Sequence, residues 1–382
     1  MPEQIPSRNR AARPHAPHAG GAHTAPLSGL MAYTRRVIVT VLILALAYLL
    51  WRGTHVLLQA FAGVLFAVLL HALSDGFARR TGLRYGWSLT VVVVTLLLLS
   101  GGLGWLLSNR LASQAAQLAD QVPQSVQQVR DTLGQSPLGQ KLLGEVPQGQ
   151  LNFAAIAQFL HFRDLLTGLT DFLVTAVVIF FVGVFGAAEP ALYRDGLLHL
   201  VPAGHRGRAS EALDAVAFNL RWWLLGQVFL MVAIGVSTTV GLWIIGVPLA
   251  LTLGIIAGVF ELVPYLGPWL SAVPAALMAL LVSPTHLVAT LVLFLALHLL
   301  EGYVLLPLVQ RRAVLMPPAL TLIMQVLFGE LLGLMGLFVA APLTVAAVVL
   351  LKMLYVEDTL GDEAVDVPGE PNNDPGPARK TG

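Results

Sequence analysis

Long apolar runs recur along the chain, each close to the roughly 20 residues that an α-helix needs to cross a bilayer. The first run follows Arg35 and Arg36 and is not followed by a small-residue cleavage site, which predicts an uncleaved signal anchor. The first three runs form an N-terminal group within 37–107. The pattern predicts an all-α polytopic membrane protein with six full spans, at 37–51, 55–73, 87–107, 166–187, 222–245 and 287–309.

The composition indicates that lipid surrounds most of the chain. Hydrophobic residues make up 56% of the 382 residues and charged residues only 11%, against roughly 25% charged residues in a soluble domain. The net charge of +1 gives no indication of a charged partner, and no nucleic-acid partner is expected. Because the chain has no cysteine, it forms no disulfide and no cysteine-ligated metal site, and no cofactor is expected.

Basic residues orient the predicted spans, because short cytoplasmic loops carry an excess of lysine and arginine. Segment 108–165 balances its charges and is rich in glutamine, so we place it outside. These assignments put both termini in the cytoplasm. The residues that mark the cytoplasmic loops are Arg79, Arg80, Arg84, Arg194, Arg206, Arg208, Arg221, Arg311 and Arg312.

Four segments lie outside the predicted bilayer. Residues 1–36 are basic, residues 355–382 are acidic, and both are predicted to be disordered tails. Segment 108–165 has apolar residues at spacings of three and four, the pattern of an amphipathic helix that either packs on the protein's own outer surface or contacts another subunit. Segment 188–221 is predicted as an amphipathic cytoplasmic linker that follows the inner interface before it turns into the span at 222.

Two prolines and a glycine interrupt an apolar segment in the stretch ELVPYLGPWL, residues 261–270. The apolar halves on either side, 249–263 and 269–282, are short for full spans. Because the preceding span ends outside and the following long helix has to end inside, this segment crosses an even number of times. The pattern therefore predicts a re-entrant helical hairpin, broken at Pro264, Gly267 and Pro268.

The C-terminal segment 317–352 repeats this pattern at an offset of 69 residues. PLALTLGIIAGVFELVPYLG aligns with PPALTLIMQVLFGELLGLMG. The two units, 222–283 and 284–354, each contain a long helix and a broken hairpin, and they start on opposite sides of the membrane. They are predicted to form an inverted-topology repeat, as in transporters whose binding site lies at paired broken helices. The aligned pairs are Pro248 and Pro317, Thr252 and Thr321, Glu261 and Glu330, and Gly267 and Gly336.

Glu261 and Glu330 each lie about one turn before a predicted break, at the C-terminal end of a half-helix, where the helix dipole already favours cations. A carboxylate at this end is poorly placed for the helix itself but well placed to hold a cation or a proton. The alternative is a glutamate at a wet hairpin tip that is simply solvated. Ionisable groups within a membrane are functional candidates by default.

Other polar residues stand out in the apolar segments. His298 and Glu301 are three residues apart and so share one helix face, either as a proton relay or as a polar patch between helices. Gln227 is predicted to donate a hydrogen bond to another helix. Thr252 and Thr321 either coordinate a ligand or bond back to their own helix.

The blocks GVPLALTLGIIAGVFELVPYLGPWLSAVPA and EGYVLLPLVQRRAVLMPPALTL resemble the signatures of the autoinducer-2 exporter family of bacterial permeases. The resemblance extends over residues 30–355 and implies a polytopic transporter of the bacterial inner membrane that assembles as a homo-oligomer, with a pentamer as one expectation. Some family members export autoinducer-2, whereas others resemble sodium/proton antiporters. The residues within its motifs are Glu261, Pro264, Gly267, Pro268, Glu301, Gly302 and Pro307. Tyr265, in the same stretch as Pro264, is a further candidate site residue.

Together these patterns predict a secondary transporter and no enzyme. We expect it to move a small polar solute such as autoinducer-2, coupled to protons or ions; a sodium/proton antiporter, which carries a monovalent cation, is the alternative. An ion channel fits less well, because a channel predicts rings of repeated residues. An intramembrane metalloprotease is excluded, since the sequence has no HExxH motif.

Overall fold

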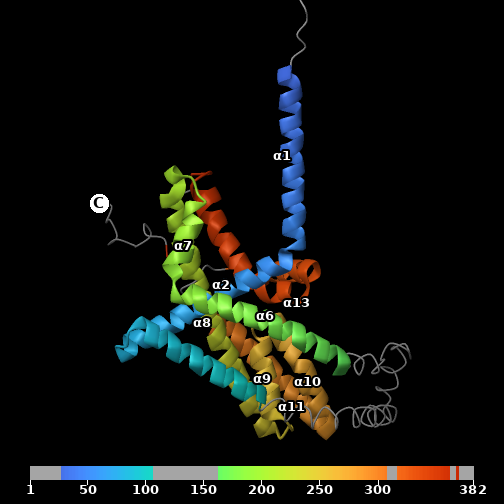
Figure 1. The fold of residues 1–382 in the computed structure, drawn as a ribbon. Helices are drawn as coiled ribbons and strands as arrows, with labels where there is room; N and C mark the ends of the chain where they lie inside the picture. Colours follow the sequence, from blue (N-terminus) through green and yellow to red (C-terminus); the bar gives the residue numbers. More distant parts are fainter. Residues whose placement is uncertain (1–26, 106–161, 308–315, 362–366, 370–382) are drawn as a thin grey trace, which may run out of the picture. The chain divides into compact units, whose positions relative to one another are not determined.

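The computed structural model describes residues 27–105, 162–307, 316–361 and 367–369, and every regular element in this part of the chain is helical. This confirms the predicted all-α polytopic membrane fold. The predicted outer amphipathic helix and residues 1–26 of the predicted disordered tail lie outside the described residues, whereas residues 27–36 of that tail are helical, contrary to the prediction. Helix α1 (Leu27–Arg52) contains the predicted signal anchor and belongs to a unit of its own, and the remaining helices form a second unit (Figure 1).

Five helical segments in the described part of the chain are long and apolar enough to cross a membrane, judged by length and composition, although one of them, Pro318–Glu357, contains a break at Gly333. A sixth span results if α6 (Phe162–Ala188) and α7 (Pro190–His199), which meet at 91°, form one bent span. Pro190 explains this bend, because a residue before proline avoids the helical conformation. The five are α2 (Thr54–Thr81), the helix Tyr85–Trp105, α8 (Arg206–Ile245) after the short η1 (Ala203–His205), α11 (Pro284–Leu300) with η2 (Glu301–Leu305), and α13 (Pro318–Leu350) with η3 (Leu351–Glu357).

Helix α8 is continuous over 40 residues. The turn predicted between the cytoplasmic linker and the span at 222 is therefore wrong, because the linker and the span form one helix. No glycine or proline interrupts residues 208–225. The apolar face that we assigned to the membrane interface packs instead inside the protein, where Leu220 and Leu224 contact Leu65 of α2 and Val345 of α13.

The N-terminal part of α8 also binds the C-terminal end of the chain. Arg208 forms a salt bridge of 2.7 Å with Glu357. The side-chain amide of Asn219 donates a hydrogen bond of 2.7 Å to the backbone carbonyl of Pro368, and Val367 is buried. Part of the segment predicted as a disordered acidic tail thus packs on this helix.

The first broken hairpin has the predicted form. Helices α9 (Ala250–Phe260) and α10 (Leu266–Val282) pack together, joined by the break at 261–265. An added Cβ on Gly246, at the end of α8, would lie 3.8 Å from Nε2 of His286 near the start of α11. The chain therefore returns after the hairpin to the end of α8 that it left, as a re-entrant segment has to do.

Gly267 permits the tight packing of this hairpin. A Cβ at Gly267 would lie less than 3.0 Å from the backbone carbonyl of Phe260, so the close approach requires glycine. Tyr265, just before α10, has φ 66° and ψ −40°, a conformation that side-chain-bearing residues rarely adopt. The break is thus a tightly built turn at the end of α9.

Helix α13 contains the second break. Gly333 has φ 67° and ψ −153°, which no helix accommodates. A Cβ on Gly336 would lie less than 3.0 Å from the backbone carbonyl of Phe328, although eight residues of straight helix would separate them by about 12 Å. The chain therefore folds back at Gly333. This position lies three residues before Gly336 and aligns with Pro264 at the offset of 69 residues.

Glycines bring α8 and α9 into close contact, and we expect their replacement to destabilise the protein. A Cβ on Gly254 would lie 2.6 Å from the backbone carbonyl of Gly235. Gly254→Ala should therefore lower the free energy of unfolding by about 1–3 kcal/mol through overpacking. The measurement is the Tm of the detergent-purified protein. Gly76→Ala is the matched control and should keep its Tm, because no described atom outside its own helix backbone lies within 4 Å of the new Cβ. Equal Tm values in the two variants would contradict the role of close glycine packing.

Candidate functional site

Glu261 lies at the C-terminal end of α9 and is fully buried, with 0% exposure. The helix ends here because Pro264 has no N–H to continue its hydrogen bonds. In the part of the chain that the structure describes, neither carboxyl oxygen of Glu261 has a hydrogen-bond partner. Since buried polar groups are nearly always hydrogen-bonded, this side chain is a strong functional candidate.

Glu301 lies where α11 continues into the π-helical turn η2 and is only 4% exposed. Single π-helical turns frequently occur at functional sites. Pro307 follows this turn and cannot donate the hydrogen bond that a regular helix would need. Nδ1 of His298 lies 3.6 Å from Oε2 of Glu301, and neither atom has a hydrogen-bond partner among the described residues. The two side chains share one helix face, as their spacing predicts.

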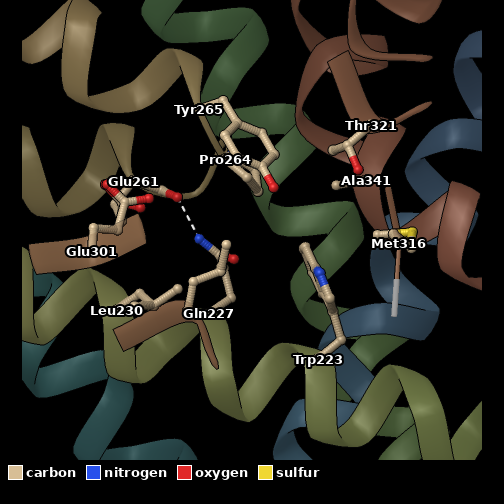
Figure 2. Close-up of a pocket in the computed structure, with 11 residues that line it drawn as sticks. Trp223, Gln227, Leu230, Glu261, Pro264, Tyr265, Glu301, Met316, Thr321 and Ala341 are labelled. Carbon is tan, nitrogen blue, oxygen red and sulfur yellow. Dashed lines mark hydrogen bonds between the residues drawn. The ribbon is translucent and has the colours of Figure 1, made fainter. Parts of the chain in front are cut away.

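The carboxyl groups of Glu261 and Glu301 lie next to each other, as Figure 2 shows. The break of the first hairpin and the π-helical turn bring them together from different helices. Two ionised carboxylates that lie next to each other in apolar surroundings repel each other. A proton or a cation between them removes the repulsion, so the pair can bind and release a positive charge.

Both glutamates line one small cavity (Figure 2). Gln227 donates a hydrogen bond to the backbone carbonyl of Glu261, and Gln325 donates one of 2.9 Å to the carbonyl of Pro264. These side-chain amides satisfy backbone groups that the break leaves free, as the membrane interior requires. The lining residues are Trp223, Gln227, Leu230, Glu261, Pro264, Tyr265, Glu301, Leu306, Met316, Thr321 and Ala341.

The structure brings half of the predicted site residues into this one cavity, which six of them line: Gln227, Glu261, Pro264, Tyr265, Glu301 and Thr321. Pro268 and His298 line a second cavity beside Glu301. The others do not line either cavity: Thr252, Gly267 and Gly336 are buried in helix packing, and Glu330 is exposed. A functional role for Glu330 stays a prediction from the repeat.

Sequence reasoning missed Gln325, which connects the second hairpin to the break of the first. Its signal was present, because it is a polar residue in an apolar helix, four residues after Thr321 and so on the same face. Trp223 and Met316 were also missed as cavity residues. Apolar residues at helical spacing give no sign in the sequence of whether they line a cavity or fill a core.

The comparison with protein families agrees with this architecture. The family model described as AI-2E family transporter matches residues 37–355. The chain belongs to the AI-2E transporter family. The match confirms the resemblance carried by the two sequence blocks, and it includes both hairpins and the glutamate pair.

Relatives of this AI-2E family protein are named as transport proteins. YrrI of Bacillus subtilis is 30% identical over 185 residues, which cover 48% of this chain and 52% of YrrI. A Thermotoga maritima protein is 28% identical over 174 residues, 45% of this chain and 53% of the relative. The matched region thus spans about half the length of these two relatives. YhhT of Escherichia coli (strain K12) is 24% identical over 333 residues, 84% of this chain and 90% of YhhT.

The AI-2E family and these relatives support a permease-type transporter, and the apolar helices indicate a multi-pass membrane protein.

Proposed function

We propose that this AI-2E family protein is a secondary transporter that exports a small polar solute in exchange for protons. The observation that carries the proposal is the buried carboxyl pair, Glu261 and Glu301, which lines a cavity built from both broken hairpins. Within a membrane, such carboxyl groups mark proton relays and substrate pathways. The pair would bind a proton in one state of the transport cycle and release it in another.

The lining of the cavity fits a small and largely neutral solute. Its walls are mostly apolar, and a few polar groups converge on it, the usual composition of a small-molecule site. Gln227, Tyr265 and Thr321 supply amide and hydroxyl groups. Autoinducer-2 is the solute that we propose. A neutral or weakly anionic solute does not itself need a carboxylate, which leaves the glutamate pair free to carry the coupling proton.

We infer that the two hairpins open the cavity alternately to the two sides of the membrane. Their breaks, at Pro264 and Gly333, are related by the offset of 69 residues found in the sequence repeat. The hydrogen bond from Gln325 to Pro264 joins the two hairpins at the cavity and would have to break or shift during such a movement. In an inverted repeat, related elements gate a central site from opposite sides. The proposal includes an inner-membrane homo-oligomer with both termini in the cytoplasm.

Flux in proteoliposomes tests this function. With an acidic lumen, outward proton flow should drive saturable accumulation of autoinducer-2 above its external concentration, and empty liposomes should show none. A sodium gradient of the same size should have no effect. Accumulation that does not depend on the proton gradient would contradict proton exchange. Flux that does not saturate with solute concentration would indicate a channel.

A sodium/proton antiporter is the second candidate, and the carboxyl pair is also the observation that favours it. Two carboxylates and nearby hydroxyl oxygens form an oxygen-rich set of ligands, as hard cations prefer. In this case sodium addition alone should change the luminal pH of the proteoliposomes. Absence of a sodium response together with accumulation of autoinducer-2 favours solute export.

A further inference from the structure

Glu301 separates two cavities. Besides the cavity shared with Glu261, it lines a second, smaller one between α8, α10 and α11. The second cavity contains polar side chains from all three helices. Its lining residues are Ile234, Thr238, Pro268, Ser271, Phe294, Leu297, His298 and Glu301.

The two cavities follow one face of α8 and lie at different depths. Trp223, Gln227 and Leu230 line the first cavity, whereas Ile234 and Thr238 line the second. These positions are separated by four, three, four and four residues, which places them on one helix face. The eleven residues from Gln227 to Thr238 correspond to about 16 Å along the helix axis. The second cavity is therefore nearer the end of α8 beside which α11 begins.

Two buried hydroxyl groups, without partners among the described residues, lie on the helices that line the second cavity. Thr238 is 0% exposed, and its hydroxyl has no hydrogen-bond partner within the described chain. The same holds for Thr290 of α11, which lies eight residues before His298 on the same helix face. The hydroxyl of Ser271 donates a hydrogen bond of 3.0 Å to the carbonyl of Pro268.

The groups facing Glu301 suit proton transfer. His298 lies on its own helix, and Glu261 and Tyr265 face it from the break between α9 and α10. The ring of His298 packs against that of Trp269, at 5.9 Å between centroids. No lysine or arginine lines either cavity in the described chain. A positive charge that arrives at Glu301 therefore meets no lysine or arginine from the described lining of either cavity.

We propose that the second cavity is the proton path to Glu301, on the opposite side of this residue from the solute. A proton that enters from solvent reaches the water held by Thr238 as hydronium; its O–H bond breaks, an N–H bond forms at Nδ1 of His298, and water and imidazolium remain. The proton then moves to Oε2 of Glu301: the N–H bond breaks, the O–H bond forms, and neutral imidazole remains. This assignment rests on the proposed proton coupling and adds its route. It keeps proton and solute in separate cavities that meet at one carboxyl group.

Hydrogen–deuterium exchange of the protonated carboxyl group, followed by infrared spectroscopy on the reconstituted protein, tests this route without any solute. The relevant carboxyl band is the one lost in both Glu261→Gln and Glu301→Gln. Thr238→Val keeps the side-chain shape but removes the hydroxyl, so the band should shift on exposure to D₂O about ten-fold more slowly than in wild type. Thr238→Ser keeps the hydroxyl and should exchange at the wild-type rate. Thr344→Val is the matched control, because this buried hydroxyl bonds the carbonyl of Ala340 in its own helix.

Each outcome of this experiment either supports or overturns the proposed proton path. Slow exchange in Thr238→Val alone supports the path. The proposed path is overturned if Thr238→Val exchanges at the wild-type rate, or if Thr344→Val slows exchange equally. Neither result would contradict proton-coupled transport, which the flux experiment in proteoliposomes tests separately. If Thr238→Val does not fold, Thr238→Ala against Thr238→Ser makes the same comparison. If no carboxyl band is lost in both glutamine variants, the pair holds no proton, and the path fails together with the proposed coupling.

Discussion

Glu261→Gln is expected to abolish accumulation of autoinducer-2 driven by a proton gradient. Glutamine has nearly the same shape as glutamate, so the cavity and the hydrogen bond from Gln227 to the backbone of residue 261 should survive. It cannot bind and release a proton, and the coupled rate should fall by on the order of 100-fold or more. The measurement is initial uptake into proteoliposomes with an acidic lumen.

Counterflow separates a lost proton site from a lost fold. Exchange of labelled for unlabelled autoinducer-2 needs no net proton movement, so the glutamine variant should retain it. Glu189→Gln is the control, since Glu189 is an exposed carboxylate between α6 and α7 and should keep full accumulation. Wild-type accumulation in the Glu261→Gln variant would show that Glu261 does not carry the coupling proton.

Gly267→Ala should stop transport with a comparably large effect. The added Cβ would lie less than 3.0 Å from the backbone carbonyl of Phe260 and at 3.0 Å from Cα of Glu261, so the break has to move. Because Glu261 is part of that break, its carboxyl group would shift away from Glu301. A displacement of 1 Å at a reacting group can cost about 100-fold in rate.

The second hairpin supplies a matched pair of variants for this test. A Cβ at Gly336 would meet the carbonyl of Phe328 in the same way, whereas a Cβ at Gly329 would meet only Leu337, at 3.7 Å. We therefore expect Gly336→Ala to be inactive and Gly329→Ala to be active, with transport normalised to the amount of folded protein. Normal transport in both Gly267→Ala and Gly336→Ala would exclude the hairpin breaks as functional elements.

The sequence was sufficient for the all-α membrane fold, for most of its long apolar helices and for the break of the first hairpin. Apolar runs report membrane crossings because lipid offers no partner for exposed backbone groups, and Pro264 with Gly267 marks a break that few other residues allow. The second break was harder to place. The repeat pointed to Gly336, whereas the turn lies at Gly333, because either glycine could take the strained conformation and only the packing of the hairpin arms decides between them.

The contact between the carboxyl groups of Glu261 and Glu301 could not be predicted from the sequence pattern. Glu261 and Glu301 were each identified as unusual within an apolar segment, but their sequence separation gave no sign that they meet. The repeat instead paired Glu261 with Glu330, which is exposed. Contacts between elements depend on how the hairpin packs against α11, and helical periodicity reports only which residues share a face of one helix. The continuous α8 was missed for a similar reason, since an amphipathic face shows burial but not what covers it.

The most direct test of the account is proton movement caused by the solute itself. Proteoliposomes that contain a pH-sensitive dye, with no imposed pH or sodium gradient, receive autoinducer-2 on the outside only. We expect solute that moves inward to drive protons outward, so that the lumen of wild-type vesicles becomes alkaline, while Glu261→Gln vesicles show no change. Solute uptake by wild-type protein without any change in luminal pH would contradict proton exchange at the Glu261–Glu301 pair.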